Sequence, residues 1–191
     1  IYNILGFYHK GTKIRRFKEA FDYIPRKNIK TSFAAALAWG IGLLERSSGS
    51  KVYITAAALK QSLESFNFIN FNLGQMGEKE NFRVIDNNQE HSIQGDLGDG
   101  SIFIQALAAS PDRQDSLNCN IGIADEIHAY KTPKQYNIIK EAMKAYTNKL
   151  MIGITTAGDE QNSFCYRRLQ YCKKILDQTV EDEAYFVFIC A

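Results

Sequence analysis

Short apolar runs alternate with longer helical stretches along most of the chain. Apolar and aromatic runs of about four to eight residues are typical of strands, and longer proline-free stretches are typical of helices. These patterns predict strands at residues 17–24, 51–56, 82–85, 91–93, 101–107, 121–124, 150–154 and 185–189. They predict helices at residues 31–46, 57–71, 133–146 and 163–176.

The alternation of strands and helices predicts how the strands pair. A helix between two strands provides the crossover that parallel strands require. We therefore predict an α/β fold with a mainly parallel sheet covered by helices on both faces. The stretch 31–46 is apolar nearly all round, which indicates a helix buried between layers. No repeat, low-complexity segment or linker divides the chain, so we expect a single domain over residues 1–191.

Composition excludes disordered and fibrous proteins, because 45% of the residues are hydrophobic and 23% are charged. A net charge of +2 is too small to indicate nucleic-acid binding by bulk electrostatics. The distribution of charge is uneven. Residues 1–30 carry eight basic and two acidic side chains, whereas residues 72–126 carry three basic and ten acidic ones. The basic N-terminal stretch could bind phosphates. The acidic stretch could bind a metal ion or could simply be exposed to solvent.

The four cysteines form no CxxC pair and no zinc-site spacing, and we interpret them as reduced thiols of a cytosolic protein. No apolar run reaches the roughly 18 residues that a membrane-spanning helix requires, so we expect no membrane partner. The chain begins with Ile rather than Met and stops at the end of an apolar run. We interpret it as a piece of a longer protein.

A basic segment, Pro-Arg-Lys-Asn-Ile-Lys-Thr at residues 25–31, joins the first predicted strand to the first long helix. A Lys-Thr pair at a helix start is typical of the end of a phosphate-binding loop. There the backbone N–H groups hold phosphate, Lys30 reaches the terminal phosphates and the Thr31 hydroxyl binds Mg²⁺. The usual sequence pattern of such a loop has glycine at two positions, and this chain has Ile24 and Ile29 there instead. A basic surface loop before a helix therefore stays an alternative for this segment.

Two further strand ends are polar. Asp125 and Glu126 follow the strand at 121–124, where the first carboxylate could support Mg²⁺ and the second could orient or deprotonate an attacking water. Acidic residues that favour the dipole of the next helix are the alternative. Thr155 and Thr156 follow the strand at 150–154 and could sense a terminal phosphate, or could simply form a turn. Together the three strand ends predict a nucleotide hydrolysis site at one edge of the sheet.

With these motifs in this order, the chain resembles the ATPase domain of the large terminase subunit of tailed bacteriophages and prophages. The resemblance extends over nearly the whole chain, through residues 16–17, 25–31, 34–40, 52–57, 125–130, 154–158 and 184–188. It implies a P-loop NTPase fold of the RecA/ASCE type. It also implies a motor in the bacterial host's cytoplasm that hydrolyses ATP, with Mg²⁺, to move double-stranded DNA into a preformed capsid.

The resemblance implies partners and missing parts as well. The expected partners are double-stranded DNA, a small terminase subunit and a portal protein, on which copies of the motor form a homo-oligomeric ring. Full-length members carry a C-terminal metal-dependent nuclease domain, which we expect to be absent from this chain. We also expect the adenine-contacting segment, which would lie upstream of the first strand, to be absent from this chain.

Residue roles follow from the same resemblance. Glu126 and Lys30 would be catalytic, and Arg113 would be an arginine finger that completes a neighbouring subunit's site. Thr155 and Thr156 would couple hydrolysis to movement. Mg²⁺ would be held by Thr31 and Asp125. The nucleotide-binding segment would consist of Arg26, Lys27, Asn28, Ile29, Lys30, Thr31 and Ser32.

One position departs from the family pattern, because Ile29 stands where glycine is usual. A β-branched residue resists the unusual backbone angles of a tight phosphate loop. A tolerant loop geometry, weakened nucleotide binding and a degenerate prophage copy are the open explanations. Two other functions stay open as well. Asp125 to His128 also fits a DExH-type helicase, and a loop disabled by Ile29 would leave a non-hydrolysing assembly module. His128 itself could contact the phosphate-sensing residues or simply open a loop.

Overall fold

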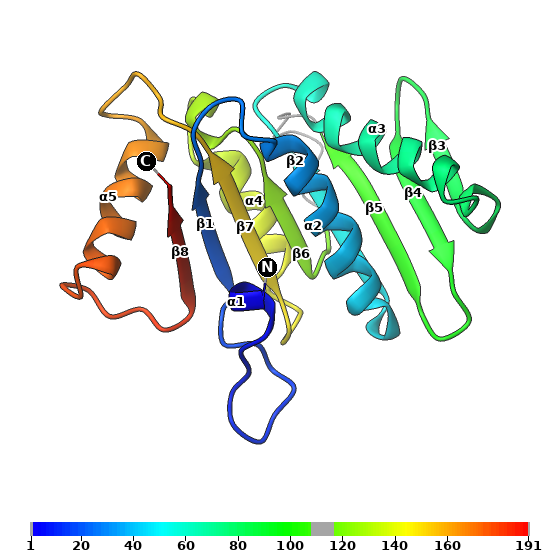
Figure 1. Cartoon of the computed structure of the whole chain (residues 1–191), viewed down its shortest axis with the longest axis horizontal. Helices are drawn as coiled ribbons and strands as arrows, with labels where there is room; N and C mark the ends of the chain where they lie inside the picture. The colour runs from blue at the N-terminus through cyan, green and yellow to red at the C-terminus, as the bar shows by residue number, and fades with distance from the viewer. Residues whose placement is uncertain (1, 108–116, 191) are drawn as a thin grey trace.

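The computed structural model describes residues 2–107 and 117–190. Within them, eight strands form one sheet in the order β3-β4-β5-β2-β6-β7-β1-β8 (Figure 1). The strands are β1 (Glu19–Tyr23), β2 (Ser50–Thr55), β3 (Arg83–Asp86), β4 (His91–Asp96), β5 (Ser101–Leu107), β6 (Ile121–Ala124), β7 (Leu150–Thr155) and β8 (Tyr185–Ile189). The α-helices are α1 (Tyr2–Leu5), α2 (Lys30–Leu44), α3 (Leu59–Gln75), α4 (Lys134–Ala142) and α5 (Phe164–Leu176).

The sheet is mainly parallel, as predicted. All strand pairs from β5 through β2, β6, β7 and β1 to β8 are parallel. Only β3–β4 and β4–β5 are antiparallel, because short turns rather than helices connect these strands. The turn between β4 and β5 requires Gly100, since a Cβ there would clash with the Arg46 carbonyl oxygen. The antiparallel strands thus extend one end of the parallel sheet.

Helices cover both faces of the sheet, which confirms the predicted layers. On one face, α2 and α3 pack through residues such as Leu37, Ile41 and Phe66 (Figure 1). On the other face, α4 and α5 contribute Tyr136 and Cys172 to a second apolar cluster. Alternate residues of each strand point to opposite faces, so Ala20 joins the first cluster and Phe21 the second. Helix α2 is not buried between two layers, contrary to the prediction from its apolar composition. It lies beside α3 on one face of the sheet, and both helices contact the strands directly (Figure 1). The side of α2 that faces the sheet and α3 is buried, whereas Ala36 and Leu44 are exposed.

The predicted elements all form, with shifted ends. The helix predicted at 57–71 continues to Gln75, and the one predicted at 133–146 ends at Ala142. The short helix α1 was not predicted, because its four residues are too few to show a helical period. Three cysteines are buried, the fourth is exposed, and all four are free thiols, as interpreted from their spacing. Among the described residues, none of the helices combines the length and apolar composition needed to cross a membrane.

A buried charge cluster joins α4 and α5 to β1 and β8. The Glu19 carboxylate accepts hydrogen bonds from the Tyr136 hydroxyl at 2.6 Å and the Lys140 amine at 2.5 Å. It also pairs with Arg168 Nη1 at 2.7 Å. The Arg168 guanidinium lies over the rings of Tyr136, Phe164 and Tyr185 at 4.8, 5.4 and 5.7 Å. Charge pairing and cation–π contacts therefore hold these four elements together.

Candidate active site

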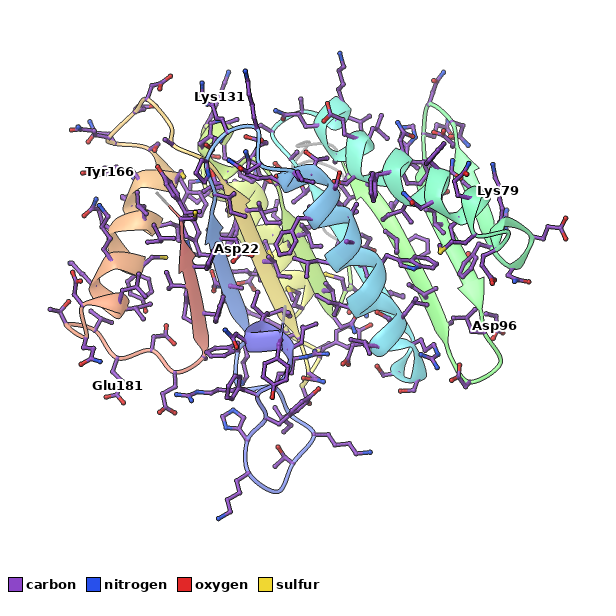
Figure 2. All side chains as sticks on the ribbon, viewed as in Figure 1. Asp22, Lys79, Asp96, Lys131, Tyr166 and Glu181 are labelled. Atoms are coloured by element: carbon purple, nitrogen blue, oxygen red, sulfur yellow. The ribbon has the colours of Figure 1, made fainter. Side chains whose placement is uncertain are left out.

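The three polar strand ends predicted from the sequence lie at one edge of the sheet. Strands β6, β7 and β1 are parallel neighbours, so their carboxyl ends point the same way. Figure 1 shows the segments that follow them together at the upper edge. Figure 2 shows Lys131 at this edge, with Asp96 and Glu181 toward the opposite one. The topology therefore brings together side chains that are far apart in the sequence.

The loop between β1 and α2 is held by its neighbours and by its own side chains. The Ile24 N–H donates to the Thr155 carbonyl at 2.9 Å, which ties the start of the loop to β7. The Asn28 amide donates to the carbonyls of Pro25 and Arg26 at 3.3 and 3.1 Å. Helix α2 begins at Lys30, and its first-turn N–H groups have no acceptor within the helix. This positive helix end is suited to an anion such as phosphate.

Ile29 has the left-handed backbone that a glycine usually supplies. Its φ is 54° and its ψ is 23°, and Lys27 also has a positive φ of 66°. For a β-branched residue this conformation costs about 1–2 kcal/mol. The Ile29 side chain is 76% exposed. The loop thus keeps a tight bend despite the missing glycine, at the cost of local strain.

Lys30, the first residue of α2, and Glu126, which follows β6, approach one another. The Lys30 side chain is buried, and its Nζ lies 3.9 Å from Glu126 Oε1 and 3.5 Å from the Pro25 carbonyl oxygen. Glu126 has a left-handed backbone too, with φ 54° and ψ 45°. Its pKa is lowered first by a hydrogen bond from His128 and further by the charges of His128, Lys30 and Arg26. Glu126 is therefore a charged carboxylate among cationic groups.

Asp125 is buried at the end of β6, with 1% of its surface exposed. Its Oδ1 accepts the Glu126 N–H at 2.8 Å, and its own N–H donates to the Thr55 carbonyl at 2.8 Å. Burial raises the pKa of Asp125 to about 6, and the charge of Glu126 acts in the same direction. A buried carboxylate is stabilised when a cation binds it. Asp125 is thus suited to receive a metal ion.

The donor chemistry at this edge fits Mg²⁺. Carboxylate and hydroxyl oxygens are hard ligands, and Asp125 and Thr31 supply one of each. Magnesium usually keeps several waters and binds one or two carboxylates together with substrate phosphates. Among the residues that the structure describes, no group of three or more His, Cys, Asp or Glu side chains could hold a metal ion.

His128 lies between Glu126 and β7. Its contact with Thr155 is one of the two alternatives that the sequence left open, and its contact with Glu126 was not predicted. Its Nδ1 lies 3.0 Å from Glu126 Oε2, and its backbone N–H donates to Thr155 Oγ1 at 3.0 Å. Thr155 Oγ1 is also 3.4 Å from His128 Nδ1 and donates to the Thr156 carbonyl at 3.2 Å. Both threonines are buried. Sequence spacing could not reveal the contact between His128 and Glu126, because it depends on the short 3₁₀ turn Ile127–Ala129.

The remaining candidates lie around this centre. Ser32 and Asn28 line a neighbouring hollow, and the Thr31 carbonyl accepts a hydrogen bond from the Ser65 hydroxyl at 3.3 Å. Arg113, the candidate arginine finger, lies outside the described residues.

The hollow beside the loop contains a buried acid, Asp22. It has a volume of about 620 Å³ and is lined by Asn3, Ile4, Asp22, Ile24, Asn28, Ile29, Ser32, Phe33, Phe186 and Phe188. Figure 2 shows Asp22 on β1. Its side chain is 2% exposed, and within the described part of the chain Oδ2 has no hydrogen-bond partner. Burial raises the pKa of Asp22 from 3.8 to about 6.

We expect the Asp22→Asn substitution to stabilise the fold at about pH 8. The folded state holds the Asp22 proton more tightly than the unfolded state, so the ionised carboxyl lowers the free energy of unfolding above about pH 6. The variant should gain about 1–3 kcal/mol near pH 8, and the gain should shrink as the pH falls from about 6 to about 4. Urea unfolding of the parent and the variant between about pH 4 and pH 8 measures this difference in the free energy of unfolding.

The exposed Asp159 provides the control for this experiment. Asp159→Asn should change the free energy of unfolding by less than about 0.5 kcal/mol at either pH. A lower stability of Asp22→Asn near pH 8 would show that the ionised Asp22 carboxylate contributes favourably to the fold.

Comparison with known proteins identifies the family. The family model described as terminase large subunit, ATPase domain, matches residues 3–174. No curated protein matches the chain at a significant level. The sequence resemblance, drawn from the motifs at the strand ends, agrees with this family model.

Solved structures of phage terminases share the fold. The HK97 bacteriophage large terminase has a TM-score of 0.71 at 19% identity, over 91% of this chain and 35% of that one. The large terminase of a thermophilic bacteriophage, solved in complex with ADP, has a TM-score of 0.68 at 10% identity, over 98% of this chain and 43% of that one. The Thermus phage P74-26 large terminase ATPase domain has a TM-score of 0.66 at 15% identity, over 100% and 84% of the two chains.

The chain therefore spans less than half of the first two of these terminases. The likeness confirms the predicted P-loop NTPase fold, and the family match extends over most of the sequence. The protein belongs to the family of terminase large subunit ATPase domains.

Proposed function

We propose that this ATPase domain binds Mg-ATP between the loop at residues 25–32 and the Asp125–Glu126 pair, and that hydrolysis there drives movement of double-stranded DNA. The observation that carries the proposal is the approach of Glu126 to Lys30 at the start of α2, at 3.9 Å. A carboxylate beside a phosphate-binding lysine is placed to act on a water that attacks the terminal phosphate. The basic loop and the positive helix end supply the site for the phosphates.

The proposed roles are those that the terminase resemblance implies for residues at these positions. Lys30 contacts the β- and γ-phosphates, while Arg26 and Lys27 add positive charge around them. Thr31 and Asp125 hold Mg²⁺. When bound, the ion would neutralise negative charge on the phosphate oxygens. Glu126 orients the water and accepts its proton. Thr155 and Thr156, at the end of β7, pass the loss of the terminal phosphate to the rest of the domain.

The proposed setting is a packaging motor. Structures of the large terminase from the thermophilic bacteriophage hold ADP and ATP-γ-S, which supports nucleotide binding by the shared fold. We infer that copies of this domain form a ring on a portal protein, together with a small terminase subunit, in the cytoplasm of a bacterial host. Arg113 would complete the site of the neighbouring copy. A nuclease domain would belong to the longer protein of which this domain is a part.

The two alternative functions have less support. The Asp-Glu-Ile-His sequence at residues 125–128 allows a DExH-type helicase, but the family model that matches is that of a terminase. A non-hydrolysing module requires that Ile29 disable the loop. The left-handed backbone of Ile29 and its exposed side chain favour a loop that tolerates the substitution.

We expect the chain to bind ATP, and Ile29→Gly to bind no more than about tenfold more tightly. The substitution relieves about 1–2 kcal/mol of backbone strain, but glycine also loses more entropy when the loop orders. Calorimetric titration of both proteins with a non-hydrolysable ATP analogue and Mg²⁺ measures the difference. Gly49→Ala, at a left-handed position remote from the loop, is a control for general strain and should leave the affinity unchanged.

The titration distinguishes the competing functions. Binding by the parent chain supports an active nucleotide site. Binding by Ile29→Gly alone would mean that Ile29 has disabled the loop, which favours the assembly module. If neither protein binds the analogue, the proposed nucleotide site is wrong.

A further inference from the structure

His128 joins two groups that the proposed mechanism uses separately. Its imidazole Nδ1 lies 3.0 Å from Glu126 Oε2, while its backbone N–H donates to Thr155 Oγ1 at 3.0 Å. The ring nitrogen is also 3.4 Å from the same hydroxyl. A single residue thus contacts both the carboxylate after β6 and the hydroxyl at the end of β7. Neither contact uses a side chain that binds phosphate or metal in the proposed site.

The turn that carries His128 packs tightly against β7 and the segment after it. Ile127 is fully buried, and a Cβ at Gly153 of β7 would lie 2.5 Å from its Cδ1. On the other side, a Cβ at Gly158 would lie 3.1 Å from the His128 Cβ. Two glycines therefore allow β7 and its following loop to approach the turn closely. A displacement of the end of β7 would have to move His128 as well, because packed contacts transmit such shifts.

The hydrogen bonds define the state of the imidazole. An ionised carboxylate only accepts hydrogen bonds, so the His128 Nδ1 must carry the proton that is donated to Glu126. The Thr155 hydroxyl accepts the His128 backbone N–H and donates its own proton to the Thr156 carbonyl. Lys30, at 3.9 Å, is the competing cation for the Glu126 carboxylate. His128 therefore contacts one oxygen of the Glu126 carboxylate, Oε2, while the other, Oε1, faces Lys30.

We propose that His128 is the positioning residue that sets the Glu126 carboxylate according to the position of the β7 end. The inference rests on the proposed role of Glu126 in hydrolysis and adds the link between that carboxylate and Thr155. When the end of β7 moves, the packed 3₁₀ turn and the His128 imidazole move with it. The Glu126 carboxylate then changes position because it is hydrogen-bonded to that imidazole. His128 contacts neither the nucleotide nor the metal ion in this scheme. Its loss should therefore affect the chemical step and spare binding.

Turnover measurements on the full chain test the link. His128→Ala should lower kcat about 10- to 100-fold and leave the KM for Mg-ATP within about twofold of the parent. His128→Asn keeps a short N–H donor and should recover part of the lost kcat. The control is His91→Ala, because His91 also pairs with a carboxylate, that of Asp86 at 2.7 Å, but lies at the far end of the sheet. The His91→Ala variant should have the same kcat for ATP as the parent.

A double substitution tests whether the effect passes through Thr155. Thr155→Val keeps the side-chain shape and removes the hydroxyl. If the link exists, the double variant with His128→Ala should be about as slow as the slower single variant, because both changes break one chain of contacts. If the kcat of the double variant is lowered by the product of the two single fold-losses, the residues act independently. This result would overturn the link.

Nitrogen NMR of the imidazoles gives a readout independent of turnover. The chain has three histidines, so their ring signals can be assigned by substitution. At about pH 8 we expect the His128 proton on Nδ1, with a signal that shifts in Glu126→Ala. A proton on Nε2 would overturn the proposal. If His128→Ala turns over like the parent while Glu126→Gln is inactive, the link is wrong and the proposed function stands. If Glu126→Gln also turns over normally, the proposed role of Glu126 fails.

Discussion

Glu126→Gln should abolish ATP turnover while nucleotide binding persists. The substitution keeps the shape of the side chain and its capacity to accept a hydrogen bond from His128, but it removes the carboxylate that we propose as the general base. Loss of a general base typically costs about 10²- to 10⁴-fold in rate, so we expect kcat to fall about 1,000-fold. The affinity for Mg-ATP should be unchanged or slightly higher, because one negative charge near the phosphates is lost. Phosphate release and calorimetric titration measure the two quantities.

Lys30→Ala gives the contrasting outcome in the same assays. Lys30 is buried at the start of α2, where we propose that it contacts the phosphates, so its loss should reduce nucleotide binding itself. A charge-assisted contact with phosphate contributes about 1.5–3 kcal/mol, which corresponds to a loss of affinity of about 10- to 100-fold. Normal binding and turnover in both variants would mean that the hydrolysis site lies elsewhere.

Arg168→Met should be the most destabilising single substitution in the charge cluster. Arg168 is largely buried, pairs with Glu19 and covers three aromatic rings. Breaking a buried ion pair leaves an uncompensated charge and costs about 3–5 kcal/mol, although Lys140 still pairs with Glu19 and favours the lower value. A loss of about 3 kcal/mol lowers Tm by about 6–12 °C for a domain of this size. Thermal and urea unfolding measure the change.

The neighbouring Arg167 is a matched control. It is an exposed arginine on the same helix, and its guanidinium donates to the Asn162 carbonyl at 2.7 Å. Arg167→Met should change stability by less than about 0.5 kcal/mol. Adding Glu19→Gln to Arg168→Met should restore part of the lost stability, because the unpaired carboxylate is removed. Equal stability of the two arginine variants would show that the buried pair contributes little.

Much of the fold follows from local pattern. The alternation of strands and helices was sufficient to predict a mainly parallel sheet with two helical layers, because crossover connections leave few other arrangements. The polar residues after β1, β6 and β7 could be assigned to one edge for the same reason. The order of strands in the sheet was not predictable, since it depends on pairs such as Glu19 with Met151 that are distant in sequence.

The details of the site depend on long-range geometry. A sequence pattern shows that Ile29 replaces glycine, but it does not show that the residue adopts the left-handed conformation nonetheless. The sequence left two roles open for His128, a contact with the residues at 155–156 or the start of a loop, and it gave no sign that the ring lies beside Glu126. The contact of Arg168 with Glu19 joins residues on α5 and β1, and no local period could have revealed it. Sequence thus indicated the chemistry of the site, and tertiary structure was needed to define its contacts.

The position of β1 between β7 and β8 has a consequence for synthesis of the chain. Strand β1 is made early, but both of its partners come from the last third of the sequence, at Leu150–Thr155 and Tyr185–Ile189. Strands β2 to β5 can pair with each other while the nascent chain is still on the ribosome. Because closing long loops is entropically costly and slow, we expect the loop between β1 and α2 to acquire its support late in folding. A prematurely terminated chain would therefore contain much of the sheet but not the proposed nucleotide site.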